Sequence, residues 1–375
     1  MKLGFLHKLG SLRTVSTVGS ILTPLVRPGI VPYPYMLTFV VTRRCNSRCI
    51  MCNLWQDKTS PILSLDQIEQ LFSQNDFSFI RVLVLTGGEP TLRPDLPEIF
   101  KIISTHCPNL ELVQLATNGL NPSRILAHVQ QMLRWVETKH GSLYRFDVQI
   151  SLDGVGEAHD KIRGVPNAFH QAVETIDQLV ALKKDFPRLG IRLSAIVVPQ
   201  NFFNLGDLKR FALERGLLVS FSPAVLSGGY YSNLESKEVL SFSIDQQVLV
   251  SKFFEHLAQV EESSLKYYYK DMKNVLLGKP RQRRCMMGFY GFVLEHDGGI
   301  YPCVNCELQS WGNLIDISFD EIWFGPRAAL FRREMVRECC QRCTSLCYPL
   351  AVNAFEVIDL VVSRIVRRIR NHFRH

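Results

Sequence analysis

Three cysteines stand within eight positions near the start of the chain, in the stretch TRRCNSRCIMCNLW at residues 42–55. Cys45, Cys49 and Cys52 are separated by three and then by two residues. Three thiolates can hold three irons of a [4Fe-4S] cube, which leaves the fourth iron free to take a chelating ligand from outside the protein. Structural zinc is the alternative, but it is closed by four ligands, and no nearby histidine or fourth cysteine completes this set. The spacing therefore predicts a reactive iron–sulfur site.

The composition indicates the kind of protein that carries this loop. Of 375 residues, 46% are hydrophobic and 21% are charged, as in an ordinary globular enzyme. The chain opens without the pattern of a secretion signal, so we expect a cytoplasmic protein whose clustered cysteines bind metal rather than form disulfides. The net charge of +8 is partly a property of the C-terminal tail. No module with interleaved basic and aromatic residues predicts nucleic acid binding, and no apolar run is long enough to span a membrane.

Short β-branched runs alternate with segments of helical periodicity over more than half of the chain. The predicted strands are 36–42, 81–86, 110–117, 146–153, 191–198 and 217–223. The predicted helices between them are 64–74, 94–106, 122–137, 167–184 and 206–215. This alternation predicts parallel βα units, rolled into a barrel or laid out as an open doubly wound sheet. In both arrangements functional residues gather at the carboxyl ends of the strands, and the cysteine loop follows the first of them.

Polar motifs end the next three predicted strands: TGGEP at 86–90, TNG at 117–119 and SLDG at 151–154. The two glycines of the first motif allow a close approach of backbone to a ligand, and Glu89 can accept hydrogen bonds from an ammonium group. Side chains alternate along a strand, so Ser151 and Asp153 are expected to point the same way and to reach one ligand, such as a pair of ribose hydroxyls. Each motif alone could be a turn or a cap, but their shared position favours a ligand site.

These motifs resemble those of the radical S-adenosylmethionine (radical SAM) superfamily. The resemblance implies an α/β fold, a partial (β/α)6 TIM-like barrel with its cluster loop after the first strand. It implies that S-adenosylmethionine (SAM) chelates the open iron and is cleaved to a 5′-deoxyadenosyl radical by an electron from the cluster. A donor such as flavodoxin or ferredoxin would supply that electron. The residues implied for SAM binding are Gly87, Gly88, Glu89, Asn118, Ser151, Asp153 and, within HDKIRG at 159–164, Arg163.

A second group of cysteines lies between residues 281 and 350, where seven of the eleven cysteines occur. Gly298 and Gly299 predict a hairpin turn between FVLEH and IYPCV. The cysteine spacing resembles the SPASM and twitch extensions of radical SAM enzymes, which hold auxiliary clusters. One auxiliary [4Fe-4S] cluster is expected, with ligands from Cys285, Cys303, Cys340, Cys343 and Cys347. The alternative is structural zinc on the two C-x2-C pairs that begin at Cys303 and Cys340. Cys107, Cys306 and Cys339 are expected to stay free.

The chain is accordingly divided into an N-terminal arm (1–35), a radical SAM core (36–235), a helical bridge (236–280), a SPASM/twitch-like domain (281–350) and a basic amphipathic helix (351–375). The apolar stripe of the terminal helix either packs on the barrel or holds the protein at the inner face of an anionic membrane.

The expected activity is hydrogen abstraction from a substrate, with a ribosomal peptide as the first candidate. A carbohydrate or a lipid-linked small molecule is the alternative substrate. A zinc- or cluster-bearing binding protein without turnover is the alternative outside enzymes. Nothing in the sequence identifies the substrate, because no motif specifies the residues that would line its pocket.

Overall fold

The computed structural model describes residues 31–57, 61–139, 141, 143–283, 285–305, 310–338 and 340–346. Most of the predicted N-terminal arm and the whole predicted terminal helix lie outside these residues. Cys306, Cys339 and Cys347 also lie outside them.

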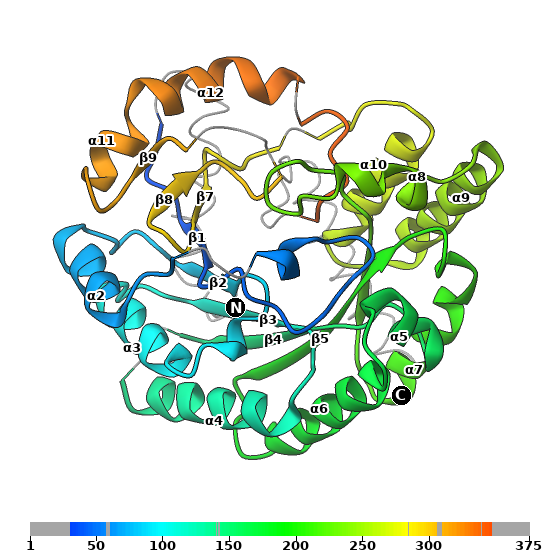
Figure 1. Ribbon diagram of the computed structural model, residues 1–375, viewed down its shortest axis with the longest axis horizontal. Coiled ribbons are helices and arrows are strands. Elements are labelled where there is room, and N and C mark those ends of the chain that lie inside the picture. The colour runs from blue at the N-terminus through cyan, green and yellow to red at the C-terminus, as the bar shows by residue number, and fades with distance from the viewer. Residues whose placement is uncertain are drawn as a thin grey trace, which may run out of the picture.

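Parallel strands form the centre of the molecule (Figure 1). They are β1 (Met36–Val40), β2 (Val82–Thr86), β3 (Leu112–Thr117), β4 (Arg145–Ser151), β5 (Leu189–Val197) and β6 (Val219–Pro223). Each strand pairs in parallel with the one before it. All six predicted strands are thus confirmed. The sheet is not closed between β6 and the far edge, so the architecture is a partial barrel.

Helices follow the strands and cover the outer face of this sheet. They are α2 (Leu65–Gln74), α3 (Leu96–His106), α4 (Pro122–Lys139), α5 (Glu157–Arg163), α6 (Ala168–Leu182) and α7 (Leu205–Glu214). Figure 1 shows α2, α3, α4 and α6 in an arc along one side of the strands. Alternate strand residues, such as Phe146, Val148 and Ile150 of β4, are buried in the core on this side. The side chains between them therefore face the inner side of the sheet.

The chain after β6 forms a helical segment and then a small second unit. The helical segment contains α8 (Lys237–Leu240), α9 (Ile244–Val260) and α10 (Leu265–Leu276). The second unit contains β7 (Gly291–Leu294), β8 (Gly299–Tyr301), β9 (Gly312–Asn313), α11 (Phe319–Trp323) and α12 (Pro326–Glu338). Strands β7 and β8 are antiparallel, and the chain turns at Gly298, whose φ is +91°, so the predicted hairpin is confirmed.

Strand β7 also pairs in parallel with β1, from Met36 opposite Gly291 to Phe39 opposite Leu294. The second unit therefore extends the barrel sheet beyond its first strand, an attachment that the sequence did not predict. It brings the second cysteine region to the edge of the sheet that carries the first cysteine loop. Within the described ranges, no helix has the length and apolarity needed to cross a membrane.

Candidate active site

The cysteine loop follows β1 at the carboxyl edge of the sheet. Cys49 is buried, and Cys45 and Cys52 are partly buried. Burial, with a smaller contribution from the nearby Cys49, raises the pKa of Cys45 to about 12 and that of Cys52 to about 12. Thiolates at this place therefore need a compensating positive charge, which bound iron supplies. The described residues do not hold three metal-ligating side chains in the arrangement of a single bound ion, but the three neighbouring thiols fit the ligand set of a cluster.

Gly87 and Gly88 are required by the backbone of the cysteine loop. A Cβ atom on Gly87, whose φ is +146°, would lie 2.2 Å from the carbonyl oxygen of Thr42. One on Gly88 would lie 2.3 Å from that of Arg44. The N–H groups of Gly88 and Glu89 donate to these same two carbonyls, each at 2.8 Å. The sequence predicted that a ligand would approach these glycines closely. In the structure the protein's own cysteine loop does so, because that loop crosses directly over the end of β2.

Glu89 is fully buried and is surrounded by neutral donors. Its Oε1 accepts hydrogen bonds from the backbone N–H and hydroxyl of Thr91, at 3.2 and 2.6 Å, and from the hydroxyl of Thr117 at 2.9 Å. Its Oε2 accepts the backbone N–H of Asn118 at 2.7 Å. Burial raises the pKa of Glu89 despite these bonds. Among the described residues no cation contacts it, so this carboxylate is hydrogen-bonded but not neutralised.

Asn118 connects the end of β3 to the cysteine loop. Its side-chain amide donates to Asn46 Oδ1 at 2.7 Å and approaches Cys45 Sγ at 3.9 Å. Its Oδ1 accepts the backbone N–H of Leu120 at 2.9 Å, which holds the amide in this direction. The polar residues at the ends of β2 and β3 and the cysteine loop thus form one continuous hydrogen-bonded group.

Arg163 ends α5 and reaches the cysteine loop from the other side. Its Nε lies 2.7 Å from Oδ2 of Asp153, and its Nη1 donates to Cys49 Sγ at 3.5 Å. Burial alone would lower the pKa of Arg163, but the Asp153 carboxylate and the Cys49 thiol together raise it, so the guanidinium stays protonated. The carbonyl oxygen of Arg163 also accepts the N–H of Arg48 at 2.8 Å. Helix α5 therefore holds the cysteine loop through both backbone and side chain.

The sequence analysis expected the side chains of Ser151 and Asp153 to point the same way, but in the structure they do not. Strand β4 ends at Ser151, so the alternation of side chains does not continue to Asp153. Asp153 is fully buried, where its Oδ1 accepts the N–H of Ile196 at 2.8 Å and its Oδ2 contacts Arg163. Ser151 stays on the inner face of the sheet, opposite Ser194 of β5. Of the two, only Ser151 is placed to reach a ligand directly.

The segment from residue 225 to 236, after β6, packs on the cysteine loop and was not identified from the sequence. The hydroxyl of Tyr230 donates to the carbonyl oxygen of Gly87 at 2.7 Å. The amide of Asn233, which is fully buried, donates to the carbonyl oxygens of Met51 at 2.7 Å and Val225 at 2.8 Å. The nearest signal in the sequence is the run SGGYYSN, whose small and amide residues are typical of a tight loop but specify no partner.

The second group of cysteines also gathers in the structure. A hydrogen bond with Cys340 lowers the pKa of Cys285 to about 6. Burial, with smaller contributions from Cys285 and Cys303, raises the pKa of Cys343 to about 11. Cys285 thus interacts with Cys340 and Cys343, and Cys343 interacts with Cys303, while Cys347 lies outside the described residues. Cys107 is fully buried in the core beside α3, as predicted for a packed thiol.

An apolar cluster lies between the two groups of cysteines. Cys52 packs against it from the first group, and Cys285 and Cys303 pack against it from the second. Its buried members are Tyr35, Met36, Val40, Leu54, Val82, Tyr230, Met286, Met287, Tyr290 and Val293. The two groups are thus joined by packed side chains that come from β1, from the segment after β6 and from the second unit.

Family comparisons agree with this arrangement. Residues 39–199 match the family model described as the radical SAM superfamily, and residues 285–344 match SPASM, described as an iron–sulfur cluster-binding domain. The chain belongs to the radical SAM superfamily and carries a SPASM domain. A radical SAM domain implies a [4Fe-4S] cluster and SAM, and a SPASM domain implies auxiliary iron–sulfur clusters. The expected fold class, family and cofactors are confirmed, and this radical SAM protein is an enzyme.

Its curated relatives have several functions. Mycofactocin maturase MftC of Mycobacterium tuberculosis is 26% identical over 80% of this chain and 72% of its own length. An AdoMet-dependent heme synthase of Oleidesulfovibrio alaskensis is 27% identical over 77% of this chain and 74% of its own length. The antilisterial bacteriocin subtilosin biosynthesis protein AlbA of Bacillus subtilis is 25% identical over 79% of this chain and 60% of its own length.

Solved structures share the fold at low sequence identity. SuiB of Streptococcus suis bound to S-adenosylmethionine superposes with a TM-score of 0.58 at 14% identity, covering 90% of this chain and 78% of SuiB. Native anSMEcpe with bound AdoMet superposes with a TM-score of 0.56 at 18% identity, covering 90% of this chain and 100% of that chain.

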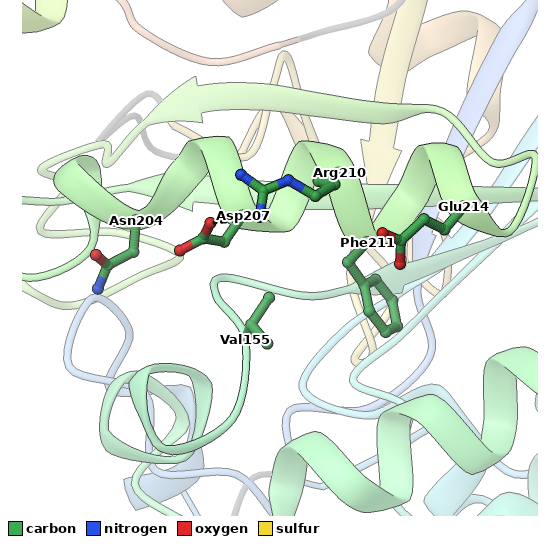
Figure 2. Close-up of a pocket in the computed structure, with 6 residues that line it drawn as sticks. All are labelled: Val155, Asn204, Asp207, Arg210, Phe211 and Glu214. Carbon is green, nitrogen blue, oxygen red and sulfur yellow. Dashed lines mark ion pairs between the residues drawn. The ribbon is translucent and has the colours of Figure 1, made fainter.

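A surface hollow of about 450 Å³ lies apart from this site, between α7 and the loop after β4 (Figure 2). Asp207 and Arg210 of α7 form an exposed ion pair there at 3.5 Å. The hollow is lined by Val155, Asn204, Asp207, Arg210, Phe211 and Glu214. None of these is a predicted site residue.

Proposed function

We propose that this radical SAM enzyme modifies a peptide substrate after hydrogen abstraction. The support comes from its relatives, which include a mycofactocin maturase and a bacteriocin biosynthesis protein. Two structural neighbours were also solved with peptides. SuiB with precursor peptide SuiA superposes with a TM-score of 0.56 over 87% of this chain. The structure of anSMEcpe with the Cp18Cys peptide superposes with a TM-score of 0.56 over 90% of it.

In this proposal Cys45, Cys49 and Cys52 hold the catalytic [4Fe-4S] cluster. When bound and reduced, the cluster and SAM supply a 5′-deoxyadenosyl radical that can take a hydrogen atom from carbon. Glu89 receives the ammonium group of SAM, because it is a buried carboxylate whose described partners are all neutral. Gly87 and Gly88 allow the cysteine loop to pack closely on the end of β2, and this packing holds the three cysteines in one arrangement.

The other predicted contacts are proposed with one change. Arg163 faces the SAM carboxylate, and Asn118 and Ser151 supply polar groups around the cofactor. Asp153 acts through Arg163, which it holds at 2.7 Å, rather than by touching the ribose. A buried guanidinium with a fixed carboxylate partner keeps one direction and one charge state, which suits it to bind an anionic group.

The second unit is proposed to hold an auxiliary [4Fe-4S] cluster on Cys285, Cys303, Cys340 and Cys343, with Cys347 as a further candidate. The mutual pKa effects of the first four thiols support this set. An external one-electron donor is needed to reduce the catalytic cluster. The apolar cluster between the two sites would keep water away from both.

A small-molecule substrate is the second candidate. The observation that favours it is the similarity to AdoMet-dependent heme synthases, at 27% identity for the protein of Oleidesulfovibrio alaskensis and 24% for that of Methanosarcina barkeri.

The test uses the protein with its clusters reconstituted under anaerobic conditions. It is incubated with SAM, dithionite and each short peptide encoded beside its gene, and peptide mass and 5′-deoxyadenosine are measured together. The proposal predicts a peptide mass change that requires SAM and is lost in Glu89→Gln. Formation of 5′-deoxyadenosine with every such peptide unchanged, while a small molecule from a cell extract is consumed, would favour the second candidate.

A further inference from the structure

The inner face of the sheet is apolar at β1 and β2 and polar at β4 and β5. Strand register places side chains in rows across this face. One row runs from Thr38 through Val84 and Gln114 to Asp147 and Gly190. The β1 and β2 side of the face joins the apolar cluster. The β4 and β5 side is polar and contains charged residues whose role the cluster and SAM chemistry does not explain.

Three of these residues form one charged group. Nε of Arg145 lies 2.5 Å from Oδ1 of Asp147, and Nε of Arg192 lies 2.8 Å from Oδ2 of Asp147. Asp147 is almost completely buried, with 2% of its side chain exposed. Two guanidinium groups on one carboxylate leave one net positive charge. A single arginine would be enough to neutralise Asp147, so the second adds a positive charge that Asp147 does not balance.

The sheet makes room for this group. A Cβ atom on Gly190, in register with Asp147, would lie 1.9 Å from Asp147 Oδ1 and 3.1 Å from Arg145 Nη2. Any other residue at position 190 would push the carboxylate away. On the same face the amide of Gln114 donates to Gln149 Oε1 at 2.9 Å, next to Arg192 in register. This arrangement is built into the strands rather than left on a mobile surface loop.

The outer nitrogens of both guanidinium groups remain available. Arg145 and Arg192 expose 42% and 47% of their side chains, although they lie on central strands. Both contact Asp147 through Nε, and in the described part of the chain their terminal nitrogens have no hydrogen-bond partner. A planar guanidinium held at Nε still offers two or more donors in a fixed direction. The pair therefore presents oriented donors with a net positive charge.

The group faces the same side as the proposed radical site. Ser194 follows Arg192 by two residues on β5 and lies opposite Ser151, the last residue of β4, so Arg192 lies about 7 Å below the carboxyl end of β4. Arg145 is the first residue of β4 and lies about 20 Å below that end. Ile196, two residues further along the same face, packs in the cluster that contains Cys49 and Met51. A substrate that reached from the cysteine loop down the inner face would meet Arg192 first and then Arg145.

We propose that Arg145 and Arg192, held by Asp147, form a substrate-binding site for a carboxylate group on the inner face of the sheet. This inference rests on the proposed function and narrows it, because the substrate would carry an acidic group that reaches down the inner face, away from the carbon that loses hydrogen. The carboxylate could belong to a peptide or to a small molecule, and the experiment separates these sources. Substrate positioning, rather than cofactor binding, is the role assigned to the two arginines.

The experiment measures binding to the full-length protein with clusters loaded and SAM bound. The first probes are two hexapeptide mixtures, identical except for Asp or Asn at one fixed position. The second probes are glutarate, its diamide and inorganic phosphate. Mass spectrometry measures the amount of each probe that stays bound to the protein. The proteins compared are the unaltered protein and the variants Arg145→Gln, Arg192→Gln and Arg192→Lys. Each single Gln variant leaves Asp147 one arginine partner, and melting temperature and iron content report on folding. Arg134→Gln, an exposed residue on α4, is the matched control.

The Asp mixture should be retained about tenfold better than the Asn mixture, as expected for hydrogen bonds to a charged group. The preference should vanish in Arg145→Gln and Arg192→Gln, survive in part in Arg192→Lys and be unchanged in Arg134→Gln. Glutarate should be preferred over its diamide with the same dependence on the arginines. If glutarate alone shows this pattern and no peptide is retained, the carboxylate site stands and the peptide proposal fails.

Retention of peptides without an acid preference, or with a preference that both Gln variants keep, would overturn the inference while leaving the peptide proposal intact. Selective binding of inorganic phosphate over glutarate would overturn the assignment to a carboxylate. Absence of any acid preference among all probes would also overturn it.

Discussion

The carboxylate Oδ2 of Asp153 lies 2.7 Å from Nε of Arg163. Both residues are buried, and the same guanidinium reaches Cys49 Sγ at 3.5 Å through Nη1. The end of β4, the end of α5 and the cysteine loop are therefore linked by one arginine. A change at Asp153 should be felt at the cluster loop although Asp153 itself touches no cysteine.

We predict that Asp153→Asn destabilises the protein by about 3 kcal/mol, because removing one partner leaves a buried charge uncompensated. SAM affinity should fall as well, since Arg163 loses its fixed direction. Urea denaturation of the apo protein and equilibrium SAM binding to the loaded protein measure the two effects. Asp207→Asn, in an exposed ion pair on α7, is the control and should change neither. Unchanged stability and affinity in Asp153→Asn would contradict the role given to this pair.

Gly88→Ala should impair the catalytic cluster without unfolding the auxiliary unit. The new methyl group would lie 2.3 Å from the carbonyl oxygen of Arg44, so the cysteine loop must move. We expect reconstituted iron to drop by about four atoms per chain, the content of one cube. Iron analysis and electron paramagnetic resonance measure this loss. Gly206→Ala in α7, where a methyl group meets nothing within 4 Å, should keep full iron. Equal iron in both variants would show that the loop tolerates the displacement.

Asn233→Ala should loosen the cover over the cysteine loop. The substitution leaves the carbonyl oxygens of Met51 and Val225 and the N–H of Ser227 without their side-chain partner. We expect a loss of about 3 kcal/mol in unfolding free energy, from buried polar groups left unsatisfied. Hydrogen exchange should rise in residues 49–53 as well as in 225–236. Lys237→Ala, exposed in the neighbouring α8, is the control. Faster exchange confined to 225–236 would mean that this segment does not hold the loop.

The strands and the cysteine motif could be predicted because their signals are local. Each strand is a short β-branched run, and the spacing of Cys45, Cys49 and Cys52 lies within one loop. The direction of Asp153 could not be predicted in this way. Its expected orientation assumed that β4 continues past Ser151, whereas the chain leaves the sheet there and the carboxylate turns to Arg163.

Contacts between segments that are distant in the sequence could not be predicted either, because no local pattern indicates them. Tyr230 binds the carbonyl oxygen of Gly87, from which it is separated by 143 positions. The pairing of β7 with β1 joins residues 255 positions apart, such as Met36 and Gly291. Neither contact leaves a motif in either partner, because a backbone carbonyl and a strand edge accept almost any residue type opposite them. Arg145 and Arg192 likewise meet only through strand register.

In the proposed function the two groups of cysteines have different tasks. The most direct test measures 5′-deoxyadenosine and modified substrate together, with dithionite and SAM, in Cys49→Ala, Cys343→Ala and Cys107→Ala. Cys107 is a buried thiol outside both groups and serves as the matched control. We predict that Cys49→Ala makes no 5′-deoxyadenosine and that Cys343→Ala still makes it but no longer modifies the substrate. Cys107→Ala should make 5′-deoxyadenosine and modify the substrate. Formation of 5′-deoxyadenosine by Cys49→Ala at the level of Cys107→Ala would contradict the central claim that the Cys45, Cys49 and Cys52 loop is the site of SAM cleavage.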